Sequence, residues 1–328
     1  MALSSIAKTY KISPMAFEKQ YKYHLSDYLE WDQKEHAENY IVFPDNIGEN
    51  LSIDETSVSN GELYTILTNK QRHGRKGALV AMVKGTKSAD IIKVLSKIPK
   101  ESCEKVKEVT LDMSNSMNVI ISTCFPQATI VIDRFHVAQL VTGAVQDVRI
   151  DIRKQAIKDE NVAHKKAKEE KKIYHPETYE NGDSKKQLLA RSRYLLFKPK
   201  SKWTESQKIR ASILFLKYPE LKKAYDLSMM FRAFYENSQT IETAKQKLDE
   251  WYRKIEERSN DKESYINGFI MTADTIRLHE LEILNYFVNR STNASAESFN
   301  AKLKGFRSLV RGVRDRKFFL FRVSKLYG

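Results

Sequence analysis

The segment LSIDETSV at residues 51–58 is the first of several short runs that are rich in β-forming residues. The turn signals SNG at 59–61 and RHG at 72–74 separate the first three runs, which predicts an antiparallel meander. Two further strands follow, each preceded by a segment whose apolar residues recur at helical spacing. We therefore predict strands at 51–58, 63–67, 78–83, 106–111 and 128–132, with helices at 88–98 and 114–124.

The predicted order of these elements is βββαβαβ. A meander followed by a βαβ alternation requires parallel strands beside antiparallel ones, in a mixed α/β sheet that helices cover. This is the order of the ribonuclease-H-like fold. In that fold the first strand lies beside the fourth, so acidic residues on these two strands come close together.

Two aspartates stand at these places. Asp54 lies in the first predicted strand and Asp112 directly follows the fourth. Carboxylates gathered in this way hold divalent metal over a phosphodiester. Glu55 is a rival for Asp54, because neighbouring residues of a strand point to opposite faces. Each aspartate has an alternative role as a cap of the next turn or helix, although Ser114 is available to cap the helix after Asp112.

A third carboxylate lies on a predicted helix near the carboxyl end of the chain. The helix begins at Asn293 or Ser295 and runs through Lys304. Asn293, Glu297, Asn300 and Lys304 recur at three- and four-residue spacing, which places them on one helix face. The alternative is a surface helix that shows this spacing by chance.

The end of the chain is strongly basic. Residues 298–328 contain nine Lys or Arg and a single acid, interleaved with aromatic residues. A helical arm that lies along a DNA backbone has this composition, and solvated helix faces over an aromatic core are the alternative. The basic residues are Lys302, Lys304, Arg307, Arg311, Arg314, Arg316, Lys317, Arg322 and Lys325.

The central part of the chain, residues 138–287, is mostly helical in pattern and highly charged. Lys and Arg crowd the stretch 149–202, which is either a phosphate-binding surface or a solvated helix face. The aromatic residues of the later helices, such as Trp251, are predicted to lie in a core. We expect an exposed loop at 175–184, where helix-breaking residues cluster.

The composition indicates the class of binding partner and the cellular compartment. The formal charge of +14 favours a polyanion, and without a long apolar run nucleic acid is a better candidate than a membrane. The two cysteines, Cys103 and Cys124, cannot by themselves build a zinc site or a disulfide framework. With no signal-peptide pattern at the amino terminus, we expect a cytoplasmic protein. Residues 4–21 predict two short helices, either a helix-turn-helix or an ordinary helical hairpin.

Several blocks of the sequence carry a family resemblance that runs from about residue 48 to the end. They resemble the blocks of bacterial insertion-sequence DDE transposases of the ISL-three group. The blocks are SIDET at 52–56, LDMS at 111–114, FPQA at 125–128, VIDRFHV at 131–137, NASAESFNAKLK at 293–304 and FRSLVRGVR at 306–314.

The resemblance implies a site and a chemistry. Asp54, Asp112 and Glu297 would be the catalytic, metal-binding triad, with two Mg²⁺ (or Mn²⁺) ions. Asp133 and His136 resemble an Asp-x-x-His signature of related transposases, and Asp133 would either lie near the metal site or hold His136. We expect Asp133, His136, Asn293 and Asn300 to contact residues of the triad without binding the metal ions themselves. Lys302, Lys304, Arg307, Arg311 and Arg314 would position DNA phosphates. The expected reaction is cleavage of transposon ends and their transfer to target DNA.

The resemblance also implies an organisation. We expect a helical amino-terminal region at 1–47, the first part of a ribonuclease-H-like core at 48–137, a helical insertion at 138–287, and the glutamate helix with a basic arm at 288–328. The family usually begins with a cysteine-rich zinc ribbon that this sequence lacks, so we expect a separate polypeptide to supply end recognition. A homo-oligomer is also expected. The alternative functions are a nuclease that does not join DNA and an inactive DNA-binding protein.

Overall fold

The computed structural model describes residues 3–59, 61–260, 265–310 and 313–328. The chain forms two compact units, Met1–Asp133 with Asn289–Gly328, and Arg134–Val288. The first contains the β-sheet and the second is built largely from helices. We call them the sheet unit and the helical unit.

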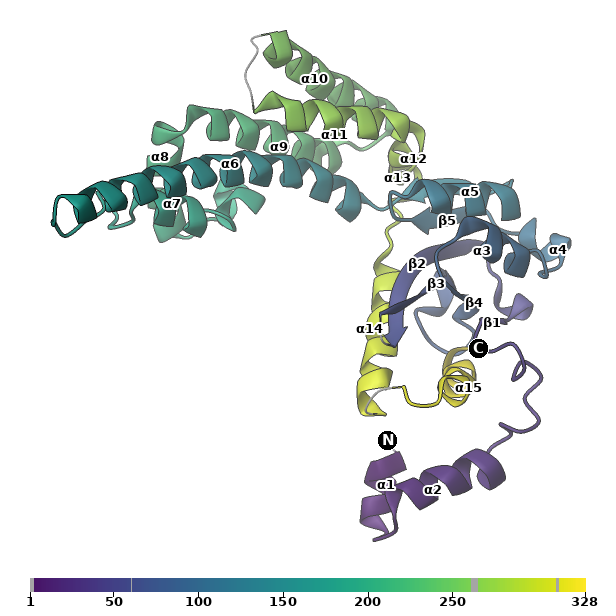
Figure 1. Ribbon diagram of the computed structural model, residues 1–328. Coiled ribbons are helices and arrows are strands. Elements are labelled where there is room, and N and C mark those ends of the chain that lie inside the picture. The colour runs from purple at the N-terminus through teal and green to yellow at the C-terminus, as the bar shows by residue number, and fades with distance from the viewer. Residues whose placement is uncertain (1–2, 60, 261–264, 311–312) are drawn as a thin grey trace. The chain divides into compact units, whose positions relative to one another are not determined.

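A six-stranded mixed sheet forms the centre of the sheet unit (Figure 1). The strand order is β1-β4-β3-β2-β5-β6. The first four strands in this order pair antiparallel, and β5 and β6 extend the sheet in parallel with β2. The predicted meander and the two parallel strands are confirmed. The strands are β1 (Tyr40–Val42), β2 (Asn50–Ser59), β3 (Glu62–Asn69), β4 (Leu79–Lys84), β5 (Glu108–Leu111) and β6 (Thr129–Ile132).

The edge strand β1 is absent from the sequence prediction. It has only three residues, too few to show the alternation by which strands are recognised. Its partner is β4, where Ile41 lies opposite Met82. Without β1, the order β4-β3-β2-β5-β6 is compatible with a ribonuclease-H-like core.

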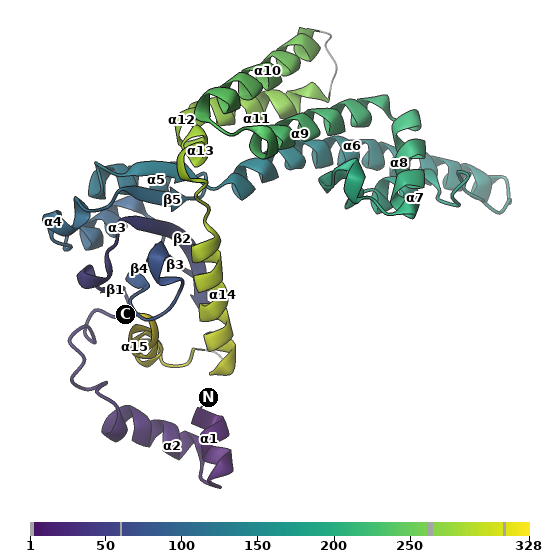
Figure 2. The same ribbon diagram turned by 180° about the vertical axis from the view of Figure 1, so that it is seen from behind.

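Two helices from the end of the chain cover one face of the sheet. They are α14 (Ala294–Leu309) and α15 (Arg316–Tyr327), and both views show α14 alongside β2 (Figures 1 and 2). Side chains from the strands and both helices form one buried core, which includes Tyr64, Ile66, Met82, Phe299, Leu303, Phe319, Leu320 and Val323. We call this side of the sheet the α14 face.

The other face carries buried apolar residues of the central strands, such as Ile53, Val109 and Leu111. The helices α3 (Ser88–Leu95) and α5 (Asn115–Cys124) pack against each other and against β4 and β5, and the short helix α4 (Lys100–Cys103) lies between them in the chain. Both predicted helices are confirmed. The first ends at Leu95, three residues before the predicted end at residue 98.

The amino-terminal region forms the two short helices that the sequence predicts, α1 (Leu3–Thr9) and α2 (Pro14–Gln20), followed by a π-helical turn at Tyr21–Leu25. Ser13 caps α2 by accepting a hydrogen bond from the amide of Ala16, and Pro14 occupies the first turn. Aromatic residues beyond α2 pack on α15, where Tyr28 contacts Phe318 and Phe321. A helix-turn-helix role for this region stays a prediction.

The helical unit begins with the 36-residue helix α6. Around it pack α7, α9 and α11, and α10 packs on α9 and α11. No described helix of the chain is long and apolar enough to cross a membrane. The helices are α6 (Arg134–Glu169), α7 (Lys185–Arg191), α8 (Glu205–Lys217), α9 (Pro219–Asn237), α10 (Ile241–Asn260), α11 (Ile266–Leu278), α12 (Glu280–Leu284) and α13 (Tyr286–Asn289), the last of which ends at the first residue of the returning chain.

The aromatic residues of α9 and α10 are buried, as predicted for the later helices. Trp251 is fully buried and its indole N–H donates to the carbonyl of Leu227 at 3.0 Å. Tyr225 is buried as well, and its hydroxyl donates to the carbonyl of Lys198 at 2.9 Å. The helical pattern at 214–227 is divided at Tyr218, because Pro219 starts a new helix where its missing N–H costs nothing.

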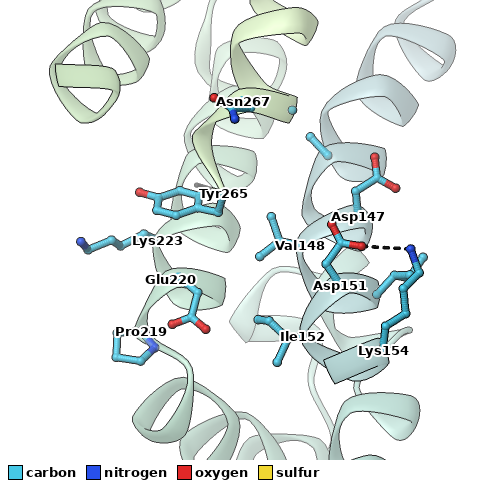
Figure 3. A pocket seen from close by; sticks show the side chains of 13 residues that line it. Asp147, Val148, Asp151, Ile152, Lys154, Pro219, Glu220, Lys223, Tyr265 and Asn267 are labelled. Atoms are coloured by element: carbon cyan, nitrogen blue, oxygen red, sulfur yellow. Dashed lines mark hydrogen bonds and ion pairs between the residues drawn. The ribbon is translucent and has the colours of Figure 1, made fainter. Parts of the chain in front are cut away.

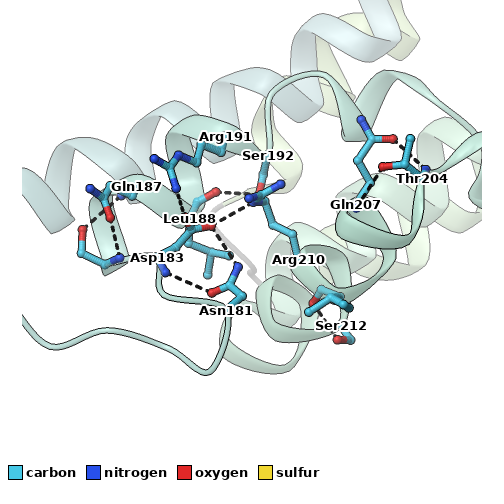
Figure 4. Close-up of polar contacts among 12 residues, drawn as sticks. Asn181, Asp183, Gln187, Leu188, Arg191, Ser192, Thr204, Gln207, Arg210 and Ser212 are labelled. Carbon is cyan, nitrogen blue, oxygen red and sulfur yellow. Dashed lines mark hydrogen bonds and ion pairs between the residues drawn. The ribbon is translucent and has the colours of Figure 1, made fainter.

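The loop at 175–184 is mostly exposed, but its end is not (Figure 4). The Asp183 side chain is fully buried, which corrects our expectation of a wholly exposed loop. Its carboxylate pairs with Arg191 of α7 and with Arg210 of α8, whose Nε lies 2.9 Å away. Burial raises the pKa of Asp183, but the hydrogen bonds from Arg210 and Arg191 outweigh it and hold this pKa below its ordinary value.

We expect the change Asp183→Asn to destabilise the protein by about 3 kcal/mol near pH 7, because it leaves two guanidinium groups without their buried counter-charge. A carboxyl group with a lowered folded-state pKa stabilises the fold above its ordinary pKa and stops doing so as the pH falls. The difference between Asp183→Asn and the parent should therefore shrink below the ordinary pKa of 3.8. Urea denaturation at several pH values measures it.

The matched control is Asp151→Asn. Asp151 pairs with Lys154 on α6 but its side chain is 73% exposed, so its removal should cost under about 1 kcal/mol. Equal costs for the two changes would contradict the structural role of Asp183.

Candidate active site

Asp54 and Asp112 lie on neighbouring parallel strands. Ser52 of β2 is in register with Thr110 of β5, so the next residues on that face are Asp54 and Asp112. Asp54 lies opposite Ile66 of β3, which belongs to the core beneath α14. Both aspartates therefore belong to the α14 face.

The helix α14 contacts both aspartates through asparagine side chains. The Asn300 amide donates from Nδ2 to Oδ2 of Asp54 at 2.6 Å. The Asn293 amide donates from Nδ2 to Oδ1 of Asp112 at 3.1 Å, and its backbone N–H donates to Oδ1 of Asp133 at 3.0 Å. Asp133 is 3% exposed and directly follows β6. The amino-terminal half of α14 and its N-cap residue are thus bound to the middle of β2 and to the residues that directly follow β5 and β6.

Glu297 lies between these two contacts on the helix. It follows Asn293 by four residues and precedes Asn300 by three, so it shares their helix face. Its side chain is exposed. Within the described ranges, no three His, Cys, Asp or Glu side chains lie close enough together to hold one metal ion. The structure therefore places Glu297 on the same helix face as Asn293 and Asn300, but it does not bring its carboxylate together with those of the two aspartates.

Glu55 is on the opposite side of β2 from Asp54, next to Asp54 in the chain. Its backbone N–H donates to Oδ1 of Asp54 at 2.7 Å. Partial burial raises the pKa of Glu55, and the negative charge of Asp112 raises it further. Of the two neighbours, Asp54 is the one that contacts α14.

Sequence comparison gives the family to which the chain belongs. The family model described as a transposase, of the ISL3 type of DDE transposases, matches residues 51–323. The chain belongs to this transposase family. No curated protein and no solved structure matches the chain. The matched range begins at β2, with Asp54, and ends within α15, so it includes every acidic residue of the candidate site.

The proposed ligands of this transposase have the chemical type that divalent metal ions prefer. Mg²⁺ and Mn²⁺ prefer oxygen ligands, and Asp54, Asp112 and Glu297 supply them. One oxygen of Asp54 and one of Asp112 accept hydrogen bonds from α14 amides, so both carboxylates already face the helix that carries Glu297. Glu297 would have to turn from its exposed position to join them.

A polar network, partly buried, lies on the same face and is missing from the sequence prediction. Lys70 donates from Nζ to Thr110 at 2.7 Å and to Glu108 at 3.3 Å, and Asn289 donates to the other oxygen of Glu108 at 3.2 Å. Burial lowers the pKa of Lys70, although Glu108 and then Asp133 oppose the change. The signal in the sequence is Glu108, Thr110 and Asp112 at every second position of one strand.

The basic residues predicted to bind DNA fall into two groups. Lys302 donates to the carbonyls of His73 and Gly74 at 2.9 and 3.0 Å, and Arg307 donates to the carbonyl of Ser57 at 3.4 Å. These two side chains therefore fasten α14 to the sheet unit.

The other basic residues of the set are Lys304, Arg314 and Arg311. Lys304 and Arg314 are exposed and form no ion pair within the described part of the chain. Arg311 lies outside the described residues. DNA binding by all these residues stays a prediction.

Two further features lie in the helical unit. His136 is in the first turn of α6, with its ring edge against Phe135, and its supporting role stays a prediction. A groove of about 950 Å³ between α6, α9 and α11 is lined by charges of both signs (Figure 3). It contains none of the residues predicted to act in the site. Its charged lining residues are Asp147, Asp151, Lys154, Glu220 and Lys223.

Substitutions at Asn300 should separate the removal of a hydrogen bond from the addition of a charge. We expect Asn300→Ala to cost about 1 kcal/mol, nearly equally at pH 7 and pH 5, because it only removes a donor to Asp54. Asn300→Asp places a second carboxylate against Asp54, which raises the pKa of the pair in the folded state. A carboxyl pKa raised on folding gives stability at low pH that is lost as the pH rises.

The cost of Asn300→Asp should therefore exceed that of Asn300→Ala at pH 7 by at least about 1 kcal/mol, and the excess should shrink toward pH 4.5. Denaturation in urea without metal measures both variants. An excess that does not change with pH would show that Asn300 does not face Asp54 in solution.

Proposed function

We propose that this chain is a metal-dependent DDE transposase that cleaves DNA at transposon ends and joins the ends to target DNA by phosphoryl transfer. Asp54, Asp112 and Glu297 are the proposed catalytic triad and the ligands of two Mg²⁺ or Mn²⁺ ions. The observation that carries the proposal is the pair of amide contacts from α14. Asn293 to Asp112 and Asn300 to Asp54 flank Glu297 on a single helix face.

The sheet and α14 position the three proposed catalytic carboxylates. Asp54 on β2 and Asp112 after β5 are held by a rigid sheet, and α14 presents Glu297 from above it. When bound, divalent ions polarise the phosphoryl group and stabilise the charge that develops on the attacking and leaving oxygens. The amides of Asn293 and Asn300 orient the two aspartates. Asp133 acts indirectly, because its carboxylate accepts a hydrogen bond from the backbone N–H of Asn293 and so helps to position that residue.

DNA would lie along α14 and the segment that leads to α15. Lys304 is exposed and follows Glu297 by seven residues, two turns along the same helix face. Arg314 is exposed before the start of α15. Phosphate contacts at these positions hold the register of the DNA without reading its sequence. Lys302 and Arg307 contribute by fixing α14, and exposed lysines of α6, such as Lys165 and Lys168, offer a second phosphate-binding surface.

The proposal extends to the organisation of the protein. We infer a ribonuclease-H-like core in the sheet unit, and the helical unit as an insertion before the glutamate helix. The strand order and the division of the chain at Asp133 and Asn289 support this inference. We also infer that the transposase acts as a homo-oligomer.

The change Asp112→Asn tests the chemistry. It removes a ligand charge while it keeps the side-chain shape, so cleavage and joining of DNA in Mg²⁺ should fall by about 10³-fold. DNA binding should persist. Asp90→Asn, at an exposed position on α3, is the matched control and should retain activity.

Three outcomes of this experiment are informative. Activity that survives in Asp112→Asn would overturn the catalytic proposal. A parent protein that cleaves but never joins would be a nuclease, and a parent that binds DNA without either reaction would be a DNA-binding protein.

The salt dependence of DNA binding tests the basic arm. Removing one side chain that binds a phosphate should reduce the slope of log K against log salt by about 0.9. We therefore expect Lys304→Ala with Arg314→Ala to reduce it by about 1.8, measured by fluorescence anisotropy on a duplex. Lys87→Ala with Lys93→Ala removes two exposed charges around α3 and should leave the slope unchanged. Equal slopes for both double variants would place the DNA elsewhere.

A further inference from the structure

We propose that Lys70, Glu108 and Asn289 form an anchor that positions the returning segment of the chain, residues 289–309, so that Glu297 stays on the helix face that contacts the two aspartates. The catalytic part of this inference rests on the function proposed above for Glu297. The structural part does not, because it concerns how α14 is held on the sheet.

Glu108 is the centre of the anchor. It is 4% exposed, and its two carboxylate oxygens take different donors. Oε1 accepts from Lys70 at 3.3 Å, and Oε2 accepts from Asn289 at 3.2 Å. Lys70 is also tied to Thr110 at 2.7 Å, on the same strand. A buried carboxylate with both oxygens engaged keeps its position, because moving it breaks several charge-assisted bonds at once.

Three asparagines fasten the returning segment to the sheet, and the side-chain amide of each donates to one acid. Asn293 and Asn300 donate to Asp112 and Asp54, which are the proposed metal ligands. Asn289 donates instead to Glu108, whose charge is already compensated by Lys70. The Asn289 contact is therefore the one of the three that does not involve a proposed metal ligand.

The backbone conformation next to Asn289 is further evidence that contacts hold the returning segment in place. Arg290 has a φ of 52°, in the left-handed region that residues other than glycine rarely adopt. Such a conformation costs about 1 kcal/mol or more and persists where neighbouring contacts maintain it. The turn at Arg290 follows the anchor and precedes α14, so it sets the direction in which the helix leaves.

Glu108 and Asp112 share one strand face, two alternations apart. The anchor and the proposed ligand therefore stand on the same rigid element, about 13 Å apart along the strand. A contact at one end of β5 then fixes the helix that completes the site at the other end.

The experiment uses the full chain with the changes Asn289→Ala and Glu108→Gln. Asn289 is itself exposed, so its truncation removes the hydrogen bond without opening the core. In metal-free protein, amide hydrogen exchange of residues 289–309 should accelerate at least about tenfold in Asn289→Ala, while exchange in α11 of the helical unit stays unchanged. Asn161→Ala, an exposed asparagine on α6, is the matched control and should change neither.

The second readout is DNA cleavage in Mg²⁺. For a positioning residue, kcat should fall about tenfold while KM for DNA stays the same, and Glu108→Gln should show the same split. Unchanged exchange in residues 289–309 overturns the anchor. Accelerated exchange with unchanged kcat overturns its role in positioning Glu297. Failure of the proposed function itself is recognised separately, by a parent protein that is inactive although its exchange responds to Asn289→Ala.

Discussion

Two side-chain amides, at the start of α14 and within it, determine how this helix docks on the sheet. Asn293 and Asn300 connect α14, near the end of the chain, to Asp112 and Asp54, which come from strands near its beginning. An aspartate on the buried face of a sheet is costly unless it finds a donor, and α14 supplies one to each. The same helix buries Phe299 and Leu303 in the core, so apolar packing and the polar contacts fix it together. The placement of Glu297 is a consequence of this docking, because the residue stands between the two asparagines.

Much of the sheet unit can be predicted from the sequence for a simple reason. Its strands are short apolar runs separated by glycine-containing turns, and its two early helices have clear apolar periodicity, so local pattern and tertiary structure agree. The common helix face of Asn293, Glu297 and Asn300 also follows from spacing alone. What spacing does not contain is side-chain conformation. Glu297 is on the expected face, yet its carboxylate is exposed, and within the described residues it is not grouped with the aspartates.

The features that the sequence does not reveal are contacts between distant residues. Lys70, Glu108 and Asn289 read as ordinary surface residues until the fold brings them together. Asp183 sits in a polar stretch typical of an exposed loop, and its burial depends on Arg191 and Arg210 in two later helices. The basic arm shows the same limit, since composition does not distinguish Lys302, which holds backbone carbonyls, from the exposed Lys304.

The contact between Asn300 and Asp54 joins residues 246 positions apart in the sequence. During synthesis at roughly 5–20 residues per second, the strand with Asp54 leaves the ribosome at least about ten seconds before α14 does. The sheet can begin to form in that interval, but its α14 face has no helix to cover it. A chain released early therefore lacks both Glu297 and the amides that hold the aspartates. Assembly order by itself keeps shorter nascent chains from acquiring the proposed activity, so that any chain able to cut DNA in this way has been translated at least through α14.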